Sequence, residues 1–516
     1  MSWKDLYELT PQLTAGEIRF ERAKRGVGLF LGPACFVLAL LLPPLPEVTL
    51  LGMRTLAIFS WIIIWWVTEP IPIPVTALLS MPLFVLCGVL PLEKAFGYWS
   101  HWAVLFLLGA FIIGHAMQKY GLTRRFSLML MASKLVGGDP WRLLVVFLLA
   151  NTVVTAILSN TVTSVLFLSM GLGLLEIMKV KPGSAYGMAM FLGVAWASNL
   201  GAVLTPGGTP TNLIAIGIMG EMEPMGYRIG YFQWFWGNLP FTILQAVAMF
   251  LVLRLFLRRE DLNYEVPQEA IREEIRHLGP FSLGEKYALG ALFSALFLWV
   301  LPELTSVVMG RSHPITALIY ERLNWGLVGL VVAVALFLLP IDWKTRKFAV
   351  TWSEAVKDIE WGTMALIAGA LAVGTTVGDK EVGLGGFFSY VVTSFAGPDV
   401  SRYLFLLGTI TLAVVLTNMV TNVAIISFLG PIALSVAPIV ELNPIALTVI
   451  VSVASCISYS LPMANPPCSI VFASGYVRIL PMFIRGMILS LIGIVLLSFV
   501  GYPVADWAFP WPPPGN

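Results

Sequence analysis

The stretch Thr155-Ala-Ile-Leu-Ser159-Asn160-Thr161 places three hydroxyl groups and one amide in the middle of an apolar segment. That segment, residues 143–175, contains no Asp, Glu, Lys, Arg or His. The hydrocarbon core of a membrane cannot satisfy polar side chains, so these groups must face protein, water or a ligand. We therefore expect this stretch to be a functional break in a membrane-embedded segment.

A second copy, Thr417-Asn-Met-Val-Thr421-Asn422-Val423, lies in another uncharged segment, residues 403–440. In both copies a hydroxyl residue is followed, after three residues, by a second hydroxyl residue and then by Asn. Polar groups that merely join helices would explain one copy. They explain two copies poorly, because the repeat continues outside the stretch, where Gly109-Ala110 is matched by Gly369-Ala370.

The composition is that of an all-α polytopic membrane protein. The chain has 516 residues, of which 58% are hydrophobic and 12% charged, and its mean hydropathy is +0.85. Several apolar runs reach the ~20 residues that a helix needs to cross a bilayer. These runs do not alternate as the strands of a membrane barrel do. The net charge of +2 gives no electrostatic support for a nucleic-acid partner.

The first stretch is expected at the tip of a re-entrant hairpin over residues 140–177, and the second copy at the tip of a second hairpin. Arg142 and Lys179, at the two ends of the first hairpin, are both basic, which favours both ends on one side of the membrane. The two hairpins would therefore dip into the membrane without crossing it.

Two broken helices are expected beside the hairpins. Pro206-Gly207-Gly208 interrupts residues 186–219, and Pro462 with Pro466 interrupts residues 444–474. A helix broken at membrane depth is tolerated where it is buried in protein or lines a cavity, and such helices mark the binding sites of secondary transporters.

Charge fixes the expected orientation. A cytoplasmic N-terminus and an external C-terminus place 24 of the 31 Lys and Arg residues on the cytoplasmic side. This arrangement needs eleven transmembrane helices and two re-entrant hairpins. An odd number of spans then separates the two copies, so the repeat is inverted. The first hairpin enters from the cytoplasm and the second from outside.

The four polar elements suit a small anion together with a hard cation. Each break supplies a helix N-terminus with free N–H groups, which attract anions. Each also supplies hydroxyl and carbonyl oxygens, which suit sodium. The apolar parts of these elements contain no Asp or Glu, which weighs against a proton relay and against a cationic substrate.

On these motifs, the chain resembles the divalent anion:sodium symporter family over residues 27–501. Ser159-Asn160-Thr161 is similar to the Ser-Asn-Thr motif of the family, as is Thr421-Asn422-Val423 with changes. Residues 68–78, Thr-Glu-Pro-Ile-Pro-Ile-Pro-Val-Thr-Ala-Leu, also resemble a family signature. The resemblance implies a multi-pass homodimer of the cell (inner) membrane that carries small anions by an elevator movement. It implies two or more sodium sites, and we expect no organic cofactor.

The resemblance also implies a division of the chain into scaffold and transport parts. The expected segments are a cytoplasmic N-terminal segment (1–26), scaffold helices 1–4 (27–138), a first set of transport elements with the hairpin and helices 5–6 (139–257), a solvated cytoplasmic linker (258–284), scaffold helices 7–9 (285–398), a second set of transport elements with the hairpin and helices 10–11 (399–501), and an external Pro-rich tail (502–516).

The family's binding residues can be carried over to matching positions in this sequence. The first sodium site would use Thr155, Ser159, Asn160 and backbone near Gly208, and the second Thr417, Thr421, Asn422 and backbone near Ala464. The substrate would meet Ser159, Asn160, Thr161, Thr209, Thr421, Asn422, Val423, Asn465 and Pro466. Val423 lacks the hydroxyl of the family's Thr, and Asn465 stands where the family commonly has Thr.

We expect a four-carbon dicarboxylate such as succinate, malate or fumarate, because two inverted Asn-bearing tips suit two carboxylates at opposite ends of a short molecule. A sodium-independent dicarboxylate exchanger and a citrate or sulfate carrier of the same family are the alternatives. A channel is a further rival, which saturable and temperature-dependent flux would exclude. An intramembrane enzyme is disfavoured, because Val377-Gly378-Asp379 has no partner Asp within a span and no Ser–His pair is available.

Overall fold

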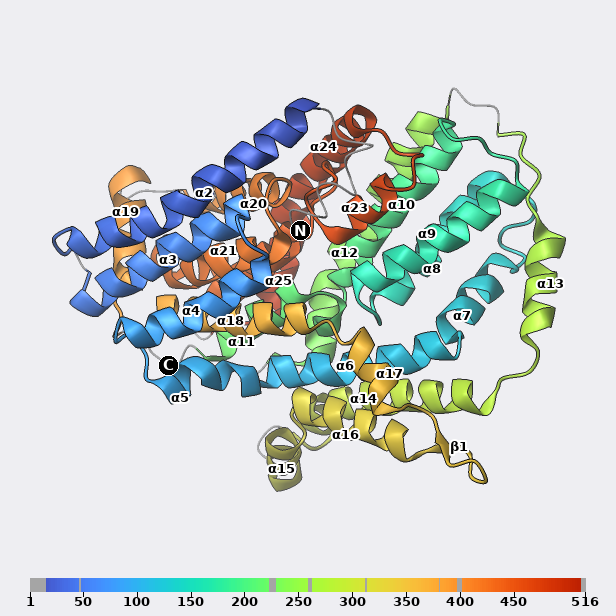
Figure 1. Cartoon of the computed structure of the whole chain (residues 1–516), viewed down its shortest axis with the longest axis horizontal. Coiled ribbons are helices and arrows are strands. Elements are labelled where there is room, and N and C mark those ends of the chain that lie inside the picture. The colour runs from blue at the N-terminus through green and yellow to red at the C-terminus, as the bar shows by residue number, and fades with distance from the viewer. Residues whose placement is uncertain are drawn as a thin grey trace.

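The computed structural model of the chain describes residues 15–45, 48–221, 229–258, 262–310, 313–379, 381–396 and 401–511 (Figure 1). Residues 1–14 of the predicted N-terminal segment and residues 512–516 of the predicted tail lie outside the described residues. So do Arg228, Arg311 and Lys380, three of the basic residues that the charge count placed on the external side.

The first half of the chain is helical throughout its described residues. Its elements are α2 (Ala15–Leu41), α3 (Leu50–Thr68), α4 (Ile73–Leu86), α5 (Leu92–Gly97), η1 (Tyr98–Ser100), α6 (Trp102–Lys119), α7 (Leu122–Met131), α8 (Pro140–Thr155), α9 (Asn160–Ile177), α10 (Ala185–Ala202), η2 (Pro206–Gly208), α11 (Pro210–Glu221) and α12 (Tyr231–Leu257). The connection between α8 and α9 and the break between α10 and α11 fall where the sequence predicted a hairpin tip and a broken helix.

The second half repeats this order after a linker helix. Its elements are α13 (Gln268–Leu278), α14 (Leu283–Met309), α15 (Pro314–Arg322), α16 (Trp325–Leu338), β1 (Pro340–Asp342), β2 (Lys347–Phe348), α17 (Trp352–Asp358), α18 (Trp361–Gly378), α19 (Leu384–Ala396), α20 (Arg402–Thr417), α21 (Asn422–Val436), η3 (Ala437–Val440), α22 (Pro444–Ser455), α23 (Pro466–Phe472), α24 (Ile479–Leu496), η4 (Leu497–Gly501) and α25 (Tyr502–Ala508). The antiparallel pair β1–β2 is a small exception to the predicted all-α class.

The two halves pack on each other through matched glycine contacts. The backbones of α6 and α16 approach so closely that a Cβ on Gly109 would lie 2.3 Å from the carbonyl carbon of Gly329. A Cβ on Gly369 of α18 would lie 2.3 Å from the carbonyl oxygen of Ala77 in α4. Gly109 and Gly369 are the repeat pair predicted from the sequence. Each lies against a helix of the opposite half, as expected for a two-fold repeat.

The hairpins and broken helices pack in a crossed arrangement. Helices α8 and α9 pack on α10, and α9 also packs on α23 of the second half. In the same way α20 and α21 pack on α22, and α21 packs on α11 of the first half. Figure 1 shows α8 and α9 in the right half of the molecule and α20 and α21 in the left half. Each hairpin therefore lies against both broken helices.

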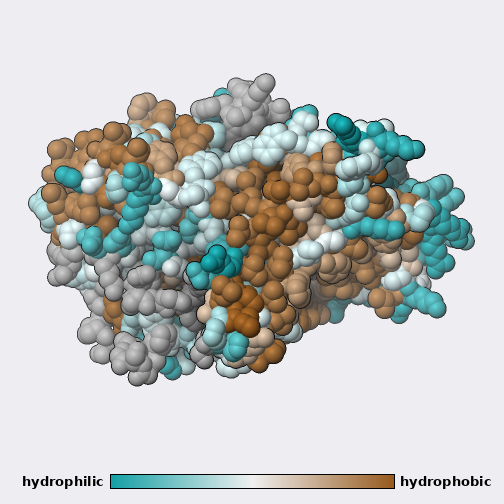
Figure 2. All heavy atoms as spheres, turned by 90° about the horizontal axis from the view of Figure 1, so that it is seen from below, coloured by the Kyte–Doolittle hydropathy of each residue, from teal (hydrophilic) through white to brown (hydrophobic). Residues whose placement is uncertain are grey.

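The surface is apolar over a wide area. Figure 2 shows a broad band of hydrophobic residues across one face, with hydrophilic residues gathered at the end where Figure 1 places α13. Within the described residues, nine helices are long and apolar enough to cross a membrane, or ten if the bent pair α15–α16 counts as one span. This supports a polytopic membrane protein. Because α9 and α21 are among the nine, helix length does not separate spans from hairpin arms, and the eleven-span topology stays a prediction.

The predicted linker, residues 258–284, contains the helix α13 but is not simply solvated. Ile271 of α13 is 3% exposed. The guanidinium of Arg125 in α7 donates to both carboxylate oxygens of Glu285 in α14 and to the carbonyl oxygens of Leu278 and Gly279. The charged pattern of this segment indicated a helix correctly, but the helix is fixed against α7.

Candidate functional site

The tip of the first hairpin carries Asn160 at the first position of α9. Asn160 is 7% exposed, and its side-chain amide forms no hydrogen bond with the described residues. Ser159, at the N-cap of α9, is half-buried and makes no side-chain capping bond, and Thr161 is also half-buried. The first N–H groups of α9 therefore lack the side-chain cap that helix starts usually have.

Thr155, at the end of α8, is fully buried and held by its own helix. Its Oγ1 lies 2.8 Å from the carbonyl oxygen of Asn151 and 3.1 Å from the Oδ1 of Asn151. The amide of Asn151 donates to the carbonyl oxygen of Val194 in α10, and Ser198 donates to its Oδ1. Asn151 thus joins the first hairpin to the helix that breaks beside it.

The first broken helix is attached to this tip at the break itself. The Oγ1 of Thr205 donates to the carbonyl oxygen of Ala156 at 2.6 Å. A Cβ on Gly201 would lie 2.2 Å from the carbonyl oxygen of Thr152, so α10 and α8 are in close backbone contact. The tip and the break therefore form one unit of structure.

The break between α10 and α11 is stabilised by Asn212. Pro206 and Pro210 lack the N–H groups that a continuous helix would use. The Nδ2 of Asn212 donates at 2.9 Å to the carbonyl oxygen of Ala202, which would pair with residue 206 in a continuous helix, and at 2.8 Å to that of Thr205. Gly208 is buried, and a Cβ there would lie 2.4 Å from the oxygen of Ala202.

Thr209, predicted on the substrate side, follows the break in extended conformation. It is 3% exposed, and its Oγ1 accepts a hydrogen bond from Thr211 at 3.3 Å. The hydroxyl of Thr211 also lies 3.4 Å from the Sγ of Cys456 at the second break. The two breaks are therefore adjacent through Thr211.

The tip of the second hairpin carries Asn422 at the first position of α21. Unlike Asn160, Asn422 is bonded: its Oδ1 lies 3.0 Å from the Oγ1 of Thr417, which also lies 2.5 Å from the carbonyl oxygen of Ser455. Thr421, at the N-cap of α21, makes no capping bond, and its buried Oγ1 has no hydrogen-bond partner among the residues that the structure describes. Val423 is buried and apolar.

Ser458 is the centre of the second break. Its Oγ donates to the Oδ1 of Asn422 at 3.1 Å and accepts from the amide of Asn465. Its carbonyl oxygen accepts from the Nδ2 of Asn465 at 2.9 Å and from the Nδ2 of Asn199 in α10 at 3.2 Å. Ser458 therefore joins the second hairpin, the second broken helix and the first broken helix.

Asn465, predicted on the substrate side, is the N-cap of α23 and has a structural role there. Its Oδ1 accepts from the backbone N–H of Cys468 at 2.9 Å, which caps the helix. Ala464 is fully buried beside it, and Pro466 is exposed at the first helical position. The replacement of the family's Thr by Asn465 thus keeps an N-cap.

The two breaks share one bonding pattern. In the first half Asn212 donates to the carbonyl oxygen of Ala202, and in the second half Cys468 donates to that of Ser458, at 3.3 Å. Asn212 and Cys468 occupy matched positions, as do Ala202 and Ser458. The repeat predicted from the prolines therefore extends to individual hydrogen bonds.

The structure joins three of the predicted second-half residues, Thr417, Asn422 and Asn465, in one hydrogen-bonded network through Ser458, and it ties the first tip to the first break. The side chains of Thr421 and Val423 are not part of that network of described residues. No hydrogen bond between described residues joins the side chains of Asn160 and Asn422. Five further polar residues hold the elements together and were not predicted: Asn151, Asn199, Asn212, Asn418 and Ser458. The signal was present, because amides in uncharged segments need partners. Asn151, Asn199, Asn212 and Asn418 lie in such segments, as Asn160 and Asn422 do.

The donor set fits a hard cation at the second tip. The unpaired Oγ1 of Thr421 and the Oδ1 of Asn422 are neutral oxygens on consecutive residues. Among the described residues, no group of three or more His, Cys, Asp or Glu is placed to hold a metal. A cation here would therefore be held by neutral oxygens, as sodium can be.

Comparison with known proteins gives consistent results. A family described as "Citrate transporter" matches residues 63–452. A sodium-dependent dicarboxylate transporter of Staphylococcus saprophyticus is 29% identical over 488 residues, covering 92% of this chain and 90% of the relative. A protein of the same name from Staphylococcus aureus strain USA300 is 27% identical, covering 93% of this chain and 91% of the relative.

Two solved transporter structures share the fold. The YdaH transporter of Alcanivorax borkumensis, whose topology is described as unusual, has a TM-score of 0.52 at 15% identity, covering 81% of this chain and 87% of its own. The MtrF structure of Neisseria gonorrhoeae, described within a class of antimetabolite efflux pumps, has a TM-score of 0.50 at 14% identity. The match covers 80% of this chain and 81% of the MtrF chain. At these identities the likeness concerns the fold alone.

Proposed function

We propose that this chain, which belongs to the citrate transporter family, is a sodium-coupled symporter of divalent anions whose substrates are C4-dicarboxylates. It is a membrane transporter and not an enzyme. Relatives named sodium-dependent dicarboxylate transporters match it along nine-tenths of its length. This supports both the coupling ion and the substrate class.

The observation that carries the proposal is the pair of uncapped hairpin tips. Helices α10 and α22, which start away from the breaks, are capped by the side chains of Ser184 and Asn443, and an uncapped helix such as α20 starts at exposed residues. The N-caps of α9 and α21, Ser159 and Thr421, make no such bond. Uncapped N–H groups at two buried helix starts attract anions, and two such starts suit the two carboxylates of a short dicarboxylate.

Sodium would be bound by the neutral oxygens at the two tips. The Oγ1 of Thr421 is buried and unpaired, and a buried unpaired hydroxyl costs ~1–3 kcal/mol. Sodium bound by Thr417, Thr421 and Asn422 would offset that cost. At the first tip, Thr155, Ser159, Asn160 and the backbone of Gly208 would form the corresponding site.

We propose that the protein is a homodimer and that its transport elements carry the substrate across the membrane by an elevator movement. The moving part would comprise the hairpins with α10–α12 and with α22–α24 and η4, which lie within residues 139–257 and 399–501. The scaffold would be residues 27–138 and 285–398. The crossed packing of each hairpin on both broken helices supports this division, because it makes the two sets of transport elements one packed unit.

Uptake by purified protein in proteoliposomes tests the proposal. Radiolabelled succinate, malate, citrate and sulfate are each supplied with a sodium, potassium or proton gradient. We expect succinate and malate uptake that requires sodium and saturates. Equal uptake without sodium, stimulated by internal dicarboxylate, would establish the exchanger instead. Sulfate uptake that dicarboxylates do not inhibit would overturn the substrate assignment.

A further inference from the structure

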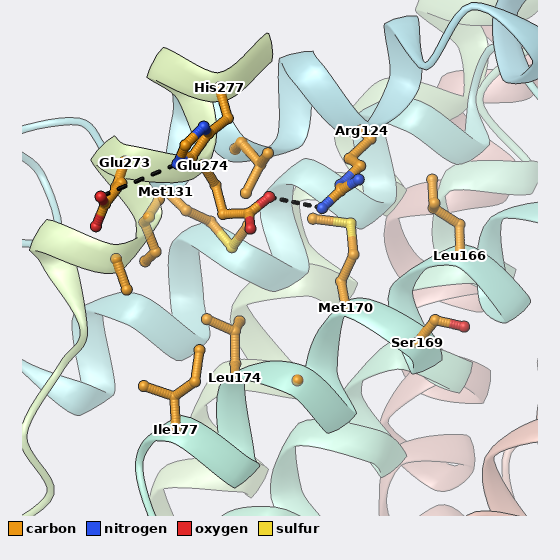
Figure 3. Close-up of a pocket in the computed structure, with 14 residues that line it drawn as sticks. Arg124, Met131, Leu166, Ser169, Met170, Leu174, Ile177, Glu273, Glu274 and His277 are labelled. Atoms are coloured by element: carbon orange, nitrogen blue, oxygen red, sulfur yellow. Dashed lines mark hydrogen bonds and ion pairs between the residues drawn. The ribbon is translucent and has the colours of Figure 1, made fainter.

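A cavity of about 630 Å³ lies between α7, α9 and the linker helix α13, away from the hairpin tips (Figure 3). Helix α9 belongs to the first hairpin, while α7 and α13 are the connections on either side of the first set of transport elements. The cavity is lined by Arg124, Leu128, Met131, Leu166, Ser169, Met170, Gly173, Leu174, Ile177, Ala270, Ile271, Glu273, Glu274 and His277. Its volume is in the range of ligand-binding cavities.

The wall made by α13 is fixed in place. The Nη2 of Arg124 in α7 lies 2.7 Å from a carboxylate oxygen of Glu274. The side chain of Gln268 donates to the carbonyl oxygen of Met131 at 3.3 Å. At the other end of α13, Arg125 binds the carbonyl oxygens of Leu278 and Gly279. The cavity is therefore a built feature between anchored helices.

The floor of the cavity is apolar and open. Met170, Leu174 and Ile177 extend from α9 into the space that Figure 3 shows below the charged residues. Ile177 is 56% exposed despite its apolar side chain. A Cβ on Gly173 would meet no atom within 4 Å. Leu174 is only 6% exposed, so the uncovered apolar surface of α9 is that of Ile177 and, in part, of Met170. Hydrocarbon fits this part of the space, because it would cover those two side chains.

The mouth of the cavity carries acidic and basic side chains. Figure 3 shows Arg124 paired with Glu274 on one side and Glu273 facing His277 on the other, with the latter two atoms 4.0 Å apart. The side chain of Glu273 is 69% exposed. A ligand at this mouth therefore meets two carboxylates, one guanidinium and one imidazole.

We propose that the cavity binds a membrane phospholipid that carries a protonated primary amine, of the phosphatidylethanolamine type. An acyl chain would lie along α9 over Gly173. The ammonium would meet Glu273, and the phosphate would meet Arg124 and His277. A phospholipid with a net negative headgroup would face two carboxylates. A choline headgroup has no N–H to donate to Glu273.

Native mass spectrometry of the purified full-length protein tests this directly. The protein is delipidated and mixed with equal amounts of phosphatidylethanolamine, phosphatidylcholine and phosphatidylglycerol of identical acyl chains. We expect the wild type to retain phosphatidylethanolamine about tenfold more than the other two. Equal retention of the three lipids would overturn the headgroup assignment.

Two variants locate the site. Gly173→Phe should fill the cavity and lower phosphatidylethanolamine retention about tenfold. Its matched control is Gly408→Phe, since Gly408 is an exposed glycine of hairpin helix α20 that also has open space around a Cβ. Retention by Gly173→Phe equal to that by Gly408→Phe would show that the lipid binds elsewhere and overturn the proposal.

A charge variant keeps the test valid if Gly173→Phe folds poorly. Glu273→Gln should remove the preference for phosphatidylethanolamine over phosphatidylcholine. Glu269→Gln, on the same helix but outside the cavity, should keep it. If Glu273→Gln retains the full preference, the ammonium does not bind at this mouth. Because these readouts are lipid retention, they are independent of whether sodium drives uptake.

Discussion

The hydroxyl of Ser458 donates a hydrogen bond of 3.1 Å to the side-chain oxygen of Asn422. Asn422 is at the tip of the second hairpin, and Ser458 is in the break of the second broken helix. The carbonyl oxygen of Ser458 also accepts from Asn199 of the first broken helix. One residue therefore connects three of the four elements that the proposed transport mechanism requires.

The variant Ser458→Ala should fold, but it should transport substrate poorly. Ala202 occupies the matched position in the first half, so the backbone conformation is compatible with Ala. Loss of the bond to Asn422 in a buried site should cost ~1–2 kcal/mol of stability and raise the half-saturating substrate concentration. Thermal unfolding in detergent and uptake kinetics measure the two effects. Unchanged kinetics would show that Ser458 has no part in the site.

Asn160→Asp and Asn422→Asp should both abolish uptake, since each places a negative charge where the substrate carboxylate would bind. Asn422 accepts hydrogen bonds from Thr417 and Ser458 through its Oδ1, and Asp keeps that acceptor, so neither bond is lost. Each variant instead places a carboxylate at a buried position, and we expect both to lose stability by a similar amount. If both variants carry succinate with unchanged affinity and sodium dependence, the proposed site is wrong.

Thr421→Val should weaken sodium activation without destabilising the protein. The Oγ1 of Thr421 is buried and unpaired, so its removal breaks no hydrogen bond within the protein. We expect the half-saturating sodium concentration to rise about tenfold. Thr76→Val is the matched control, because Thr76 in α4 also has a buried, unpaired Oγ1. A sodium dependence altered equally in both variants would argue against a site at Thr421.

Gly369→Ala should destabilise the protein by ~1–3 kcal/mol, because its Cβ would lie 2.3 Å from the backbone oxygen of Ala77. Gly408→Ala, in open space, should be neutral or stabilising, since Ala favours helix over Gly by ~1 kcal/mol. Thermal unfolding in detergent compares the two. Equal melting temperatures would mean that α4 and α18 are not in close contact.

The predicted orientation is tested by cysteine accessibility in intact cells. A cysteine at Glu269 of α13 should react with membrane-impermeant reagents only after the cells are opened. A cysteine at Gly515, outside the described residues, should react from outside. Labelling of position 269 in intact cells would contradict the predicted orientation and place α13 outside the cell.

The sequence alone determined the class of the protein, its family and the four places where helices stop, at the two predicted hairpin tips and in the two broken helices. The re-entrant topology of the hairpins stays a prediction. Long uncharged segments are required for membrane insertion, and prolines stop helices locally, so these features depend on neighbouring residues. The polar residues at 155–161 and 417–423 stood out because hydrocarbon cannot satisfy them.

The partners of those residues were decided by the tertiary structure. Thr417 lies in the same stretch as Asn422, but nothing in that stretch indicates that Ser458, in the second break, also bonds it, since hydrogen bonds between distant segments depend on packing. Nor does the sequence indicate that the Asn160 amide makes no hydrogen bond with the described residues. The same holds for α13, whose charged pattern suggested solvation. Its contact with α7 exists because Arg125 finds acceptors in Glu285, Leu278 and Gly279 once the chain has folded. A periodic pattern specifies which face of a helix is apolar, and the three-dimensional arrangement decides what covers it.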